Sequence, residues 1–430
     1  MRISIQQINS VLGSALITAM PVLLLTEIGH ASNAWYALVL SSLVMWFTRE
    51  GGIRATLTGL RPYQTLASAL AYCLLPTLLF MILHRTGAGA ELERATRLLC
   101  GCLFVLGAVL SMKPQWLRQA SWGFVLAGLA SSAYVFWPAE RELGRPLTPE
   151  FNSVSYGNLM LLIAVLLMYS TRWKLTPWSQ TEKTIKWITI CITLVAFVFT
   201  ETRTGWLALP VFGVIWLYLN GWVKRLATMV YVAIGLIAVC TVLILSIPKM
   251  HQRITDGVNE VTECLTTNST AFTSTCIRMQ LWRSSIDMFV ENPILGLGLR
   301  KNFQPELQQR VSKGFVSQRV ADGWAEPHSD MMMVLATQGV LGGLGLLLVY
   351  FAPAFLFARR LSVGRDNNAR VAAAMGLAIC LGFAVFGITE LMFRGMRTVG
   401  FYAVMIGWLL ALSDPALSEE QPPCKCTSAP

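Results

Sequence analysis

One histidine stands where a polar segment of the chain meets an apolar one. The polar segment ends in Pro327, and His328 then precedes a long apolar stretch. Because proline is tolerated in the first turn of a helix, we expect His328 to lie in the first turn of a helix that begins here. The positive field of a helix N-terminus favours a neutral imidazole, which can accept a proton, and it also attracts phosphate. A histidine that only anchors a helix end would fit the same pattern.

Three arginines have the surroundings of anion-binding residues. Arg203 begins an apolar stretch, where its planar guanidinium could hold phosphate oxygens, although an arginine near a membrane interface can simply extend to water. Arg278 falls four residues before Trp282 on an apolar helical stripe, so we expect it to need a buried anionic partner. Arg283 is followed four residues later by Asp287, and an ordinary pair within one helix would explain it.

Four more charged residues are candidates for binding a substrate. Arg300 follows a glycine turn and is a candidate phosphate contact. Glu390 and Arg394 fall in the last predicted loop, where ionisable groups often mark a substrate path. A local pair between these two residues is the simpler alternative. Glu326 could orient the nearby imidazole or bind an acceptor sugar, and it could equally be a solvated acid.

Several chemical classes are absent from the sequence. It contains no Walker loop, dinucleotide fingerprint or metalloprotease signature in a supporting context, and no aspartate-rich cluster suited to Mg²⁺ beside a pyrophosphate. No Cys/His spacing resembles a zinc site. We therefore expect neither a metal nor a cofactor, so arginines would have to neutralise any bound pyrophosphate. The formal net charge is +11, but no nucleic-acid-binding module accompanies it, and we expect no nucleic acid partner.

The elements that must position these residues are membrane helices. Hydrophobic residues make up 54% of the chain and charged residues 13%. Apolar runs of roughly 17–25 residues can each cross a hydrocarbon core, and they must be helical because their backbone polar groups have no other partners in lipid. We predict an all-α polytopic membrane protein with about twelve transmembrane helices. The predicted spans are 10–28, 33–48, 64–83, 96–111, 119–137, 153–170, 185–200, 204–220, 227–247, 329–352, 369–388 and 396–413.

The basic residues orient this bundle. Among the short connecting segments, lysine and arginine are concentrated on the side of the N-terminus, so both termini are expected in the cytoplasm. The chain then divides into nine membrane helices over 1–247, a long external loop over 248–327, three membrane helices over 328–413, and a tail over 414–430. The tail is polar and proline-rich, and we expect it to be disordered.

The long loop carries signs of order. Residues 277–290 have helical periodicity, with an apolar stripe predicted to lie on the external membrane surface as a lid or platform. Cys264 and Cys276 are the two cysteines of this loop, and on the oxidising side of a membrane they can form a disulfide. Free thiols are the alternative. The residues of the predicted stripe are Trp282, Ile286, Phe289 and Val290.

Two motifs resemble those of a known family. His328-Ser329, nine residues, Gly339, two residues and Gly342 resembles the long-loop motif of the bacterial O-antigen ligases. Arg203 to Leu207 is similar to the Arg-x-x-x-Leu element of that family and of the related O-antigen polymerases. The order of about twelve spans, with the long loop between the ninth and the tenth, is also similar to that family.

The resemblance implies a fold, a reaction and two lipid substrates. The fold would be of the GT-C type, in the bacterial inner membrane, with the active site on the periplasmic face. The reaction would move O-antigen polysaccharide from undecaprenyl pyrophosphate to a sugar hydroxyl of lipid A–core, with inversion and without metal or ATP. His328 and Arg203 correspond to the motif residues of the family, whereas Arg278 is placed only by its position in the loop.

These expectations assign roles that chemistry can support. His328 would accept the proton of the acceptor hydroxyl, and Arg203 and Arg278 would neutralise charge on the departing pyrophosphate. Three other classes remain open: an O-antigen polymerase, a protein O-oligosaccharyltransferase, and a transporter of the lipid-linked sugar. The remaining residues expected to bind substrate are Arg283, Arg300, Glu326 and Arg394.

Overall fold

The protein is helical throughout the part of the chain that can be described. The computed structural model describes residues 5–26, 30–137, 141–142, 145–146, 148, 152–202, 204–222 and 248–418, with isolated positions between 228 and 246. The helices are α1 (Ile5–Leu25), α2 (Ala31–Thr48), α3 (Gly52–Leu60), α4 (Gln64–Tyr72), α5 (Leu75–His84), α6 (Gly89–Val109), α7 (Pro114–Gln119), α8 (Trp122–Phe136), α9 (Ser153–Ser170), α10 (Ser179–Phe199), α11 (Thr204–Leu219), α13 (Pro248–Thr266), α14 (Ser274–Glu291), α15 (Phe303–Ser312), α16 (Gln318–Gly323), α17 (Asp330–Val363), α18 (Asn367–Phe386), α19 (Met396–Leu412) and α20 (Pro415–Ser418). Short 3₁₀ turns are η1 (Arg61–Tyr63) and η2 (Arg300–Asn302), and β1 (Arg141–Glu142) pairs antiparallel with β2 (Arg145–Pro146).

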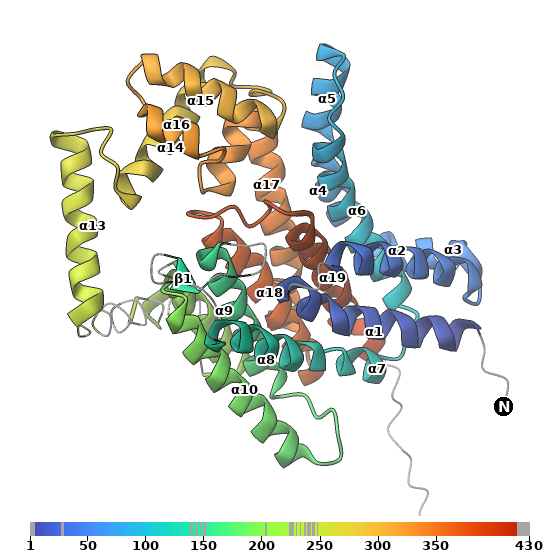
Figure 1. Ribbon diagram of the computed structural model, residues 1–430. Coiled ribbons are helices and arrows are strands. Elements are labelled where there is room, and N and C mark those ends of the chain that lie inside the picture. The colour runs from blue at the N-terminus through green and yellow to red at the C-terminus, as the bar shows by residue number, and fades with distance from the viewer. Residues whose placement is uncertain are drawn as a thin grey trace, which may run out of the picture.

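Most of the predicted apolar spans overlap helices of the structure, many of which are labelled in Figure 1. The span 64–83 forms two helices, α4 and α5, with Pro76 in the first turn of the second. The span 227–247 falls largely outside the described residues. Five helical stretches of the described chain are long and apolar enough to cross a membrane, while α11 and α19 are apolar but shorter. The stretches are Ile8–Leu25, Gly52–His84, Ser153–Ser170, Asp330–Val363 and Asn367–Phe386.

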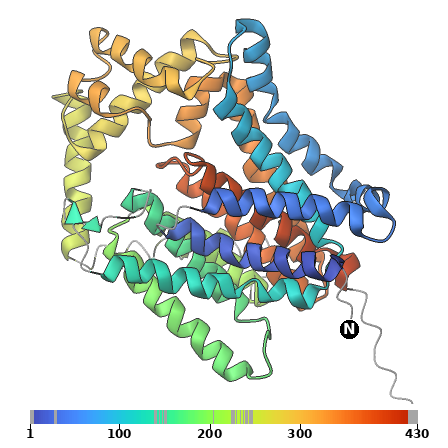
Figure 2. The ribbon, with the colours of Figure 1, turned by 45° about the vertical axis from the view of Figure 1, so that its right-hand side comes forward.

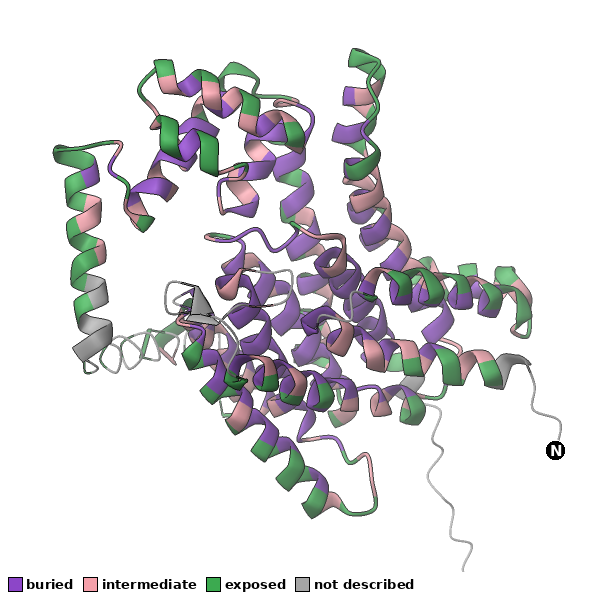
Figure 3. Cartoon of the chain, viewed as in Figure 1, coloured by how far each residue is buried: buried purple, intermediate pink, exposed green. Residues whose placement is uncertain are grey.

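The core of the bundle lies around α9, α18 and α19. These helices are buried on nearly all sides, and Figure 3 shows their ribbons almost entirely in the colour of buried residues. A helix that is hydrophobic all round belongs in such a position. Close approach between α19 and α6 depends on Gly407, because a Cβ there would lie 2.5 Å from the carbonyl oxygen of Cys102.

Helix α17 is interrupted at the first glycine of the predicted motif. Gly339 has a φ of +61°, and a Cβ on it would lie 2.4 Å from the carbonyl carbon of Ile294. The backbone of the segment after α14 fills the break: Leu297 N donates to Ala336 O at 3.0 Å, and Val340 N donates to Pro293 O at 2.8 Å. This insertion explains the kink and why the position needs glycine.

A small helical unit sits above the bundle in Figures 1 and 2, formed by α14, α15 and α16 against the first turns of α17. The helix predicted over 277–290 is present as α14, and the face that it buries differs from the predicted apolar stripe, whose place on a membrane surface stays a prediction. Ile286 and Val290 are 50% and 67% exposed, whereas Leu281 and Ser284 are fully buried. Serine can occupy the buried face because its hydroxyl bonds within its own helix: Ser284 Oγ donates to Gln280 O at 2.9 Å.

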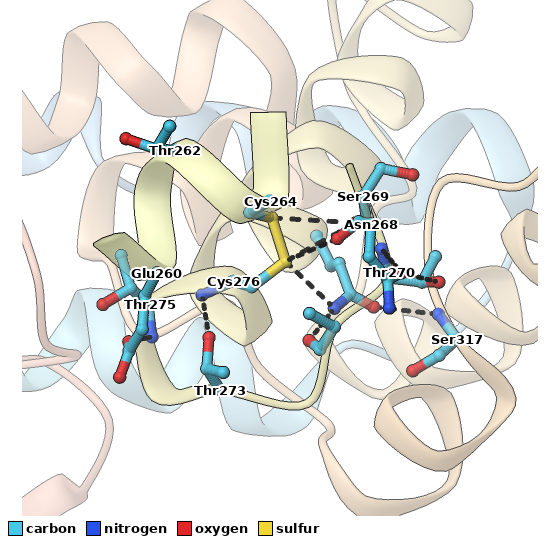
Figure 4. The surroundings of a disulfide bond; sticks show 12 residues. Glu260, Thr262, Cys264, Asn268, Ser269, Thr270, Thr273, Thr275, Cys276 and Ser317 are labelled. Atoms are coloured by element: carbon cyan, nitrogen blue, oxygen red, sulfur yellow. Dashed lines mark hydrogen bonds between the residues drawn. A yellow bond between two sulfur atoms is a disulfide. The ribbon is translucent and has the colours of Figure 1, made fainter. Parts of the chain in front are cut away.

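A disulfide joins α13 to the start of α14, as Figure 4 shows. It links Cys264 and Cys276, whose Cα atoms are 5.6 Å apart. Next to it, Gln280 Nε2 donates to Ala271 O at 2.9 Å, and Thr275 N donates to the Glu260 carboxylate at 3.1 Å. These contacts anchor the end of α14 that carries Arg278.

The predicted tail over 414–430 begins with the short helix α20, and residues 419–430 lie outside the described residues.

Candidate active site

His328 lies just outside α17 rather than in its first turn. Ser329 is the N-cap, and its hydroxyl accepts from Met332 N at 3.4 Å. His328 itself has a φ of +49°, a left-handed conformation that is uncommon for residues other than glycine. The predicted first-turn position is therefore wrong, because the serine after the histidine is the better cap.

Hydrogen bonds on both sides hold the histidine in this conformation. Trp282 Nε1 donates to the carbonyl of Pro327 at 3.0 Å. On the other side, Asp330 N donates to the carbonyl of Gly387 at 2.9 Å, and Ser329 Oγ reaches the same oxygen at 3.4 Å. Strained backbone persists only where its surroundings over-determine it, and it is frequent at functional sites.

The imidazole faces a buried carboxylate. Glu390 is 1% exposed, and its Oε2 lies 3.5 Å from His328 Nδ1. Arg278 Nη2 donates to Glu390 Oε1 at 3.0 Å, and Asn152 Nδ2 donates to Oε2 at 2.9 Å. These four residues, Asn152, Arg278, His328 and Glu390, form the Glu390 cluster. Arg278 thus has the buried anionic partner that its position in the sequence required.

Glu390 remains ionised in this environment. Burial would raise the pKa of its carboxyl group, but the nearby His328 imidazole, the Asn152 amide and the Arg278 guanidinium together lower that pKa below its usual value. A carboxylate in this position can fix the orientation of the imidazole and stabilise its protonated form.

The alternative of a local pair between Glu390 and Arg394 is not what the structure shows. The Glu390 side chain turns inward, whereas Arg394 is 60% exposed and its Nη1 lies 3.1 Å from Glu326 Oε1. The predicted pair between Arg283 and Asp287 is wrong as well, because Asp287 instead accepts from Arg310 Nε at 3.2 Å. In both cases a partner distant in sequence displaces the nearest one.

Asp330 positions the segment that carries Glu390. Its buried carboxylate accepts from Tyr350 Oη at 2.8 Å, from Met392 N at 3.1 Å and from Phe393 N at 3.2 Å. The residue two positions after His328 therefore fixes the loop 387–395. Sequence reasoning missed Asp330, although an acid at the start of an apolar span was a usable signal.

Asn152 was also missed, because an asparagine before a helix reads as a cap. It does cap α9, since its Oδ1 accepts from Ser155 N at 2.7 Å, while its amide nitrogen serves Glu390. Arg203 lies outside the described residues. Its chain neighbour Thr202 donates to the carbonyl of Ser153, beside Asn152, at 3.2 Å.

Two clefts flank the segment 391–395. The Asn152 cleft is lined by Asn152, Ser155, Met392 and Arg394, and it encloses about 660 Å³, part of which is open solvent. It therefore shares Asn152 with the Glu390 cluster.

The second cleft, the Arg94 cleft, encloses about 540 Å³, again including open solvent. Thr77, Glu91, Arg94, Arg300 and Phe393 contribute to its lining. Arg300 thus faces a different cleft from that of Arg394. The segment 391–395 contributes residues to both clefts, Phe393 to one and Arg394 to the other.

The described part of the chain contains no group of three or more His, Cys, Asp or Glu side chains arranged to hold a metal ion. The charged groups available at the site are guanidinium, carboxylate and imidazole. Such a set can bind anions, orient a hydroxyl and transfer a proton.

Comparison with known proteins shows a similarity over the central part of the chain. Residues 188–347, from α10 through the kink of α17, match the family model described as O-Antigen ligase. An uncharacterized protein of Haemophilus influenzae is 19% identical over 217 residues, which are 50% of this chain and 53% of that protein. The chain thus spans about half the length of this curated relative. The segment that carries Arg278 and His328 is thus similar to the O-antigen ligase family, in a chain whose long apolar helices point to a multi-pass membrane protein.

Proposed function

We propose that the protein is an O-antigen ligase, which transfers O-antigen polysaccharide from undecaprenyl pyrophosphate to a sugar hydroxyl of lipid A–core. The observation that carries this proposal is the Glu390 cluster. It joins an imidazole to an ionised carboxylate and an arginine, and two of its members lie inside the segment matched to the ligase family.

His328 acts as the general base of this reaction. The acceptor hydroxyl attacks the anomeric carbon while the bond to the pyrophosphate breaks, and the hydroxyl proton passes to Nε2 of His328. Glu390, 3.5 Å from Nδ1, holds the ring and stabilises the imidazolium that forms. Proton transfer by a positioned side chain contributes about 10²–10⁴-fold in rate. A single displacement of this kind inverts the anomeric centre.

Arginines stabilise the leaving group. Arg203 and Arg278 neutralise the charge that grows on the departing pyrophosphate, as expected for electrostatic catalysis. The Arg278 side chain is 33% exposed, so its guanidinium can contact Glu390 on one side and a substrate on the other. Pyrophosphate is already a good leaving group, and its departure supplies the driving force. The reaction therefore requires neither metal nor ATP.

The Asn152 cleft receives the reacting end of the donor. It joins the exposed Arg394 to the N-terminus of α9, and helix N-termini attract phosphate. Glu326, held by Arg394, accepts from sugar hydroxyls at the rim, and Arg283 and Arg300 contribute further contacts to substrate. The site faces the periplasm, with both chain termini in the cytoplasm and the protein in the inner membrane.

A polymerase that joins O-antigen repeats is the second candidate, because the matched superfamily includes both activities. The two share the donor and differ in the acceptor. The His-Ser-x₉-Gly-x-x-Gly element favours the ligase. Transport of the lipid-linked sugar is disfavoured, because the proposed residues gather around one surface loop.

A reconstituted transfer assay tests the proposal. Purified protein would be mixed with undecaprenyl-pyrophosphate-linked O-antigen and rough lipopolysaccharide, in EDTA and without ATP. We expect a ladder of substituted lipopolysaccharide from the parent protein and none from folded Arg203→Ala. Elongated lipid-linked polymer without substituted lipopolysaccharide would identify a polymerase instead, and a dependence on added metal would overturn the mechanism.

A further inference from the structure

The two arginines of the Arg94 cleft are without carboxylate partners. Arg94 Nη2 donates to the carbonyl of Arg394 at 3.5 Å, and Arg300 Nη1 donates to the carbonyl of Phe393 at 3.2 Å. Arg94 Nε is buried and has no acceptor among the described residues. Within the same described ranges, no carboxylate lies at ion-pair distance from either guanidinium, in contrast to Arg278 and Arg394. Both arginines are only partly exposed, and cations withdrawn from water in proteins are normally paired.

The nearest acids are engaged by other donors. Glu91 Oε1 accepts from the backbone N of Arg300 at 3.0 Å. Asp330 accepts from Tyr350 and from the backbone of the segment 391–395. Burial, together with the charge of Arg300, lowers the pKa of Arg94, but a guanidinium stays charged at neutral pH. The cleft therefore offers cationic N–H donors that its own carboxylates do not satisfy.

A third donor lies on the same cleft. Thr77 of α5 is 2% exposed, and its hydroxyl has no hydrogen-bond partner among the described residues. A buried hydroxyl without a partner destabilises a protein, because it has given up its hydrogen bonds to water. An oxygen-rich anion held by Arg94 and Arg300 would supply its acceptor.

The rest of the lining is apolar. Leu98, Val334 and Leu346 line the cleft, and each is at most 8% exposed. Next to Thr77 in the chain, α5 carries Leu75 and Leu78, which are 43% and 41% exposed. In Figures 1 and 2, α5 projects beyond the bundle. The cleft thus has a charged end and an apolar wall that continues onto the exposed helix α5. An amphiphile has the same two parts, a charged head and an apolar chain.

We propose that the Arg94 cleft binds the phosphate group of a phosphorylated lipid through Arg94, Arg300 and Thr77, with the lipid chain along α5. This inference rests on the proposed function in one respect, because it extends the substrate-binding role proposed there for Arg300. The segment 391–395 separates this site from the Asn152 cleft, so the protein holds a lipid phosphate apart from the reacting one. Binding can be measured without any transfer.

The test is a binding titration of the full chain in mild detergent with three probes: phosphatidic acid, diacylglycerol and inorganic phosphate. We expect phosphatidic acid to bind at least tenfold more tightly than either of the others. Arg94→Gln should weaken its binding roughly 10- to 100-fold, the range for a hydrogen bond to a charged group. Lys301→Gln is the matched control, because it removes an exposed cation beside Arg300 and should leave binding unchanged.

Thr77→Val distinguishes ligand binding from a structural role. It removes the hydroxyl but keeps the shape, so binding should weaken several-fold while the unfolding temperature of the lipid-free protein stays level or rises. Equal binding of phosphatidic acid by parent and Arg94→Gln would overturn the proposal, and so would equal binding of diacylglycerol. Competition by inorganic phosphate at equal concentration would show a site for free anions and overturn the lipid assignment. His328→Ala should bind phosphatidic acid normally, so a failure here is separable from a failure of the transfer reaction.

Discussion

Two charged clusters share helix α14 and use their charges in opposite ways. At one end, Arg310 is 1% exposed and surrounded by the carboxylates of Asp287, Glu291 and Glu306, a set we call the Arg310 cluster. At the other end, the Glu390 cluster surrounds one buried carboxylate with an arginine, an amide and an imidazole. In the first cluster, carboxylates of the protein contact every guanidinium nitrogen of one buried arginine. In the second cluster, the arginine and the imidazole remain partly exposed.

The difference separates a structural role from a functional one. The Arg310 cluster ties α14 to α15 and has no donor left for a ligand, since Nε and both terminal nitrogens of Arg310 contact carboxylates. In the Glu390 cluster, Arg278 and His328 are 33% and 20% exposed. We therefore expect changes in the first cluster to alter stability, and changes in the second to alter the reaction.

Replacing the central arginine should have the largest effect on stability. Arg310→Met leaves three carboxylates facing one another, and losing one partner of a buried ion pair lowers the free energy of unfolding by about 3–5 kcal/mol. Thermal unfolding in detergent would measure this, with transfer activity falling only as far as folded protein is lost. Lys313→Met, at a 43% exposed position of the same cluster, is the control and should change little. If Arg310→Met lost most of its transfer activity while it stayed as stable as the parent, the structural role of the Arg310 cluster would be contradicted.

Replacing the central carboxylate should affect the reaction instead. Glu390→Gln keeps the shape but removes the charge that orients and stabilises the imidazole, so kcat should fall about 10²-fold with little change in KM for the donor. The unfolding temperature should stay close to that of the parent. Glu390→Asp should recover part of the rate. Unchanged kcat with a lowered unfolding temperature would make Glu390 merely structural.

Removing the disulfide should have an intermediate and local effect. The pair Cys264→Ser and Cys276→Ser frees α13 and the first turn of α14, and short-loop disulfides contribute about 2–3 kcal/mol. Hydrogen exchange should increase around Arg278 but not around Asp287. Equal protection of both regions would show that the disulfide does not support the Glu390 cluster.

Acid should produce the smallest effect. The pKa of Glu390 is lower in the folded protein than its ordinary value of 4.5, so its stabilising contribution is complete above that value and is lost as pH falls through the folded pKa. Between about pH 5 and pH 3, the parent should lose more stability than Glu390→Gln. Parallel curves for the two proteins would show that Glu390 is not ionised in the folded state.

Much of the helical framework could be predicted, because long apolar runs allow few alternatives in a membrane. The sequence also pointed to His328 and Arg278, since a histidine at a polar–apolar junction and an arginine on an apolar stripe are both unusual. The pairing of Glu390 could not be predicted. It depends on Asp330 holding a loop distant in sequence, whereas reasoning from neighbours offered only Arg394 as a partner.

The face of α14 could not be predicted for a related reason. Hydrophobic periodicity marks an apolar side with Trp282 and Ile286, predicted to face a membrane surface, but it does not indicate that the protein itself packs against the side with Ser284, whose hydroxyl is satisfied within the helix. The arginines of the Arg94 cleft were equally hidden, because only the folded structure shows which cations have no carboxylate partner.

The most direct test of the account is the transfer rate of His328→Ala, measured beside its unfolding temperature on the same preparation. The account predicts a rate about 10²–10⁴-fold below that of the parent, with an unchanged unfolding temperature. Transfer at the parental rate by the folded variant would contradict the central claim, that the imidazole held against Glu390 is the base of the reaction.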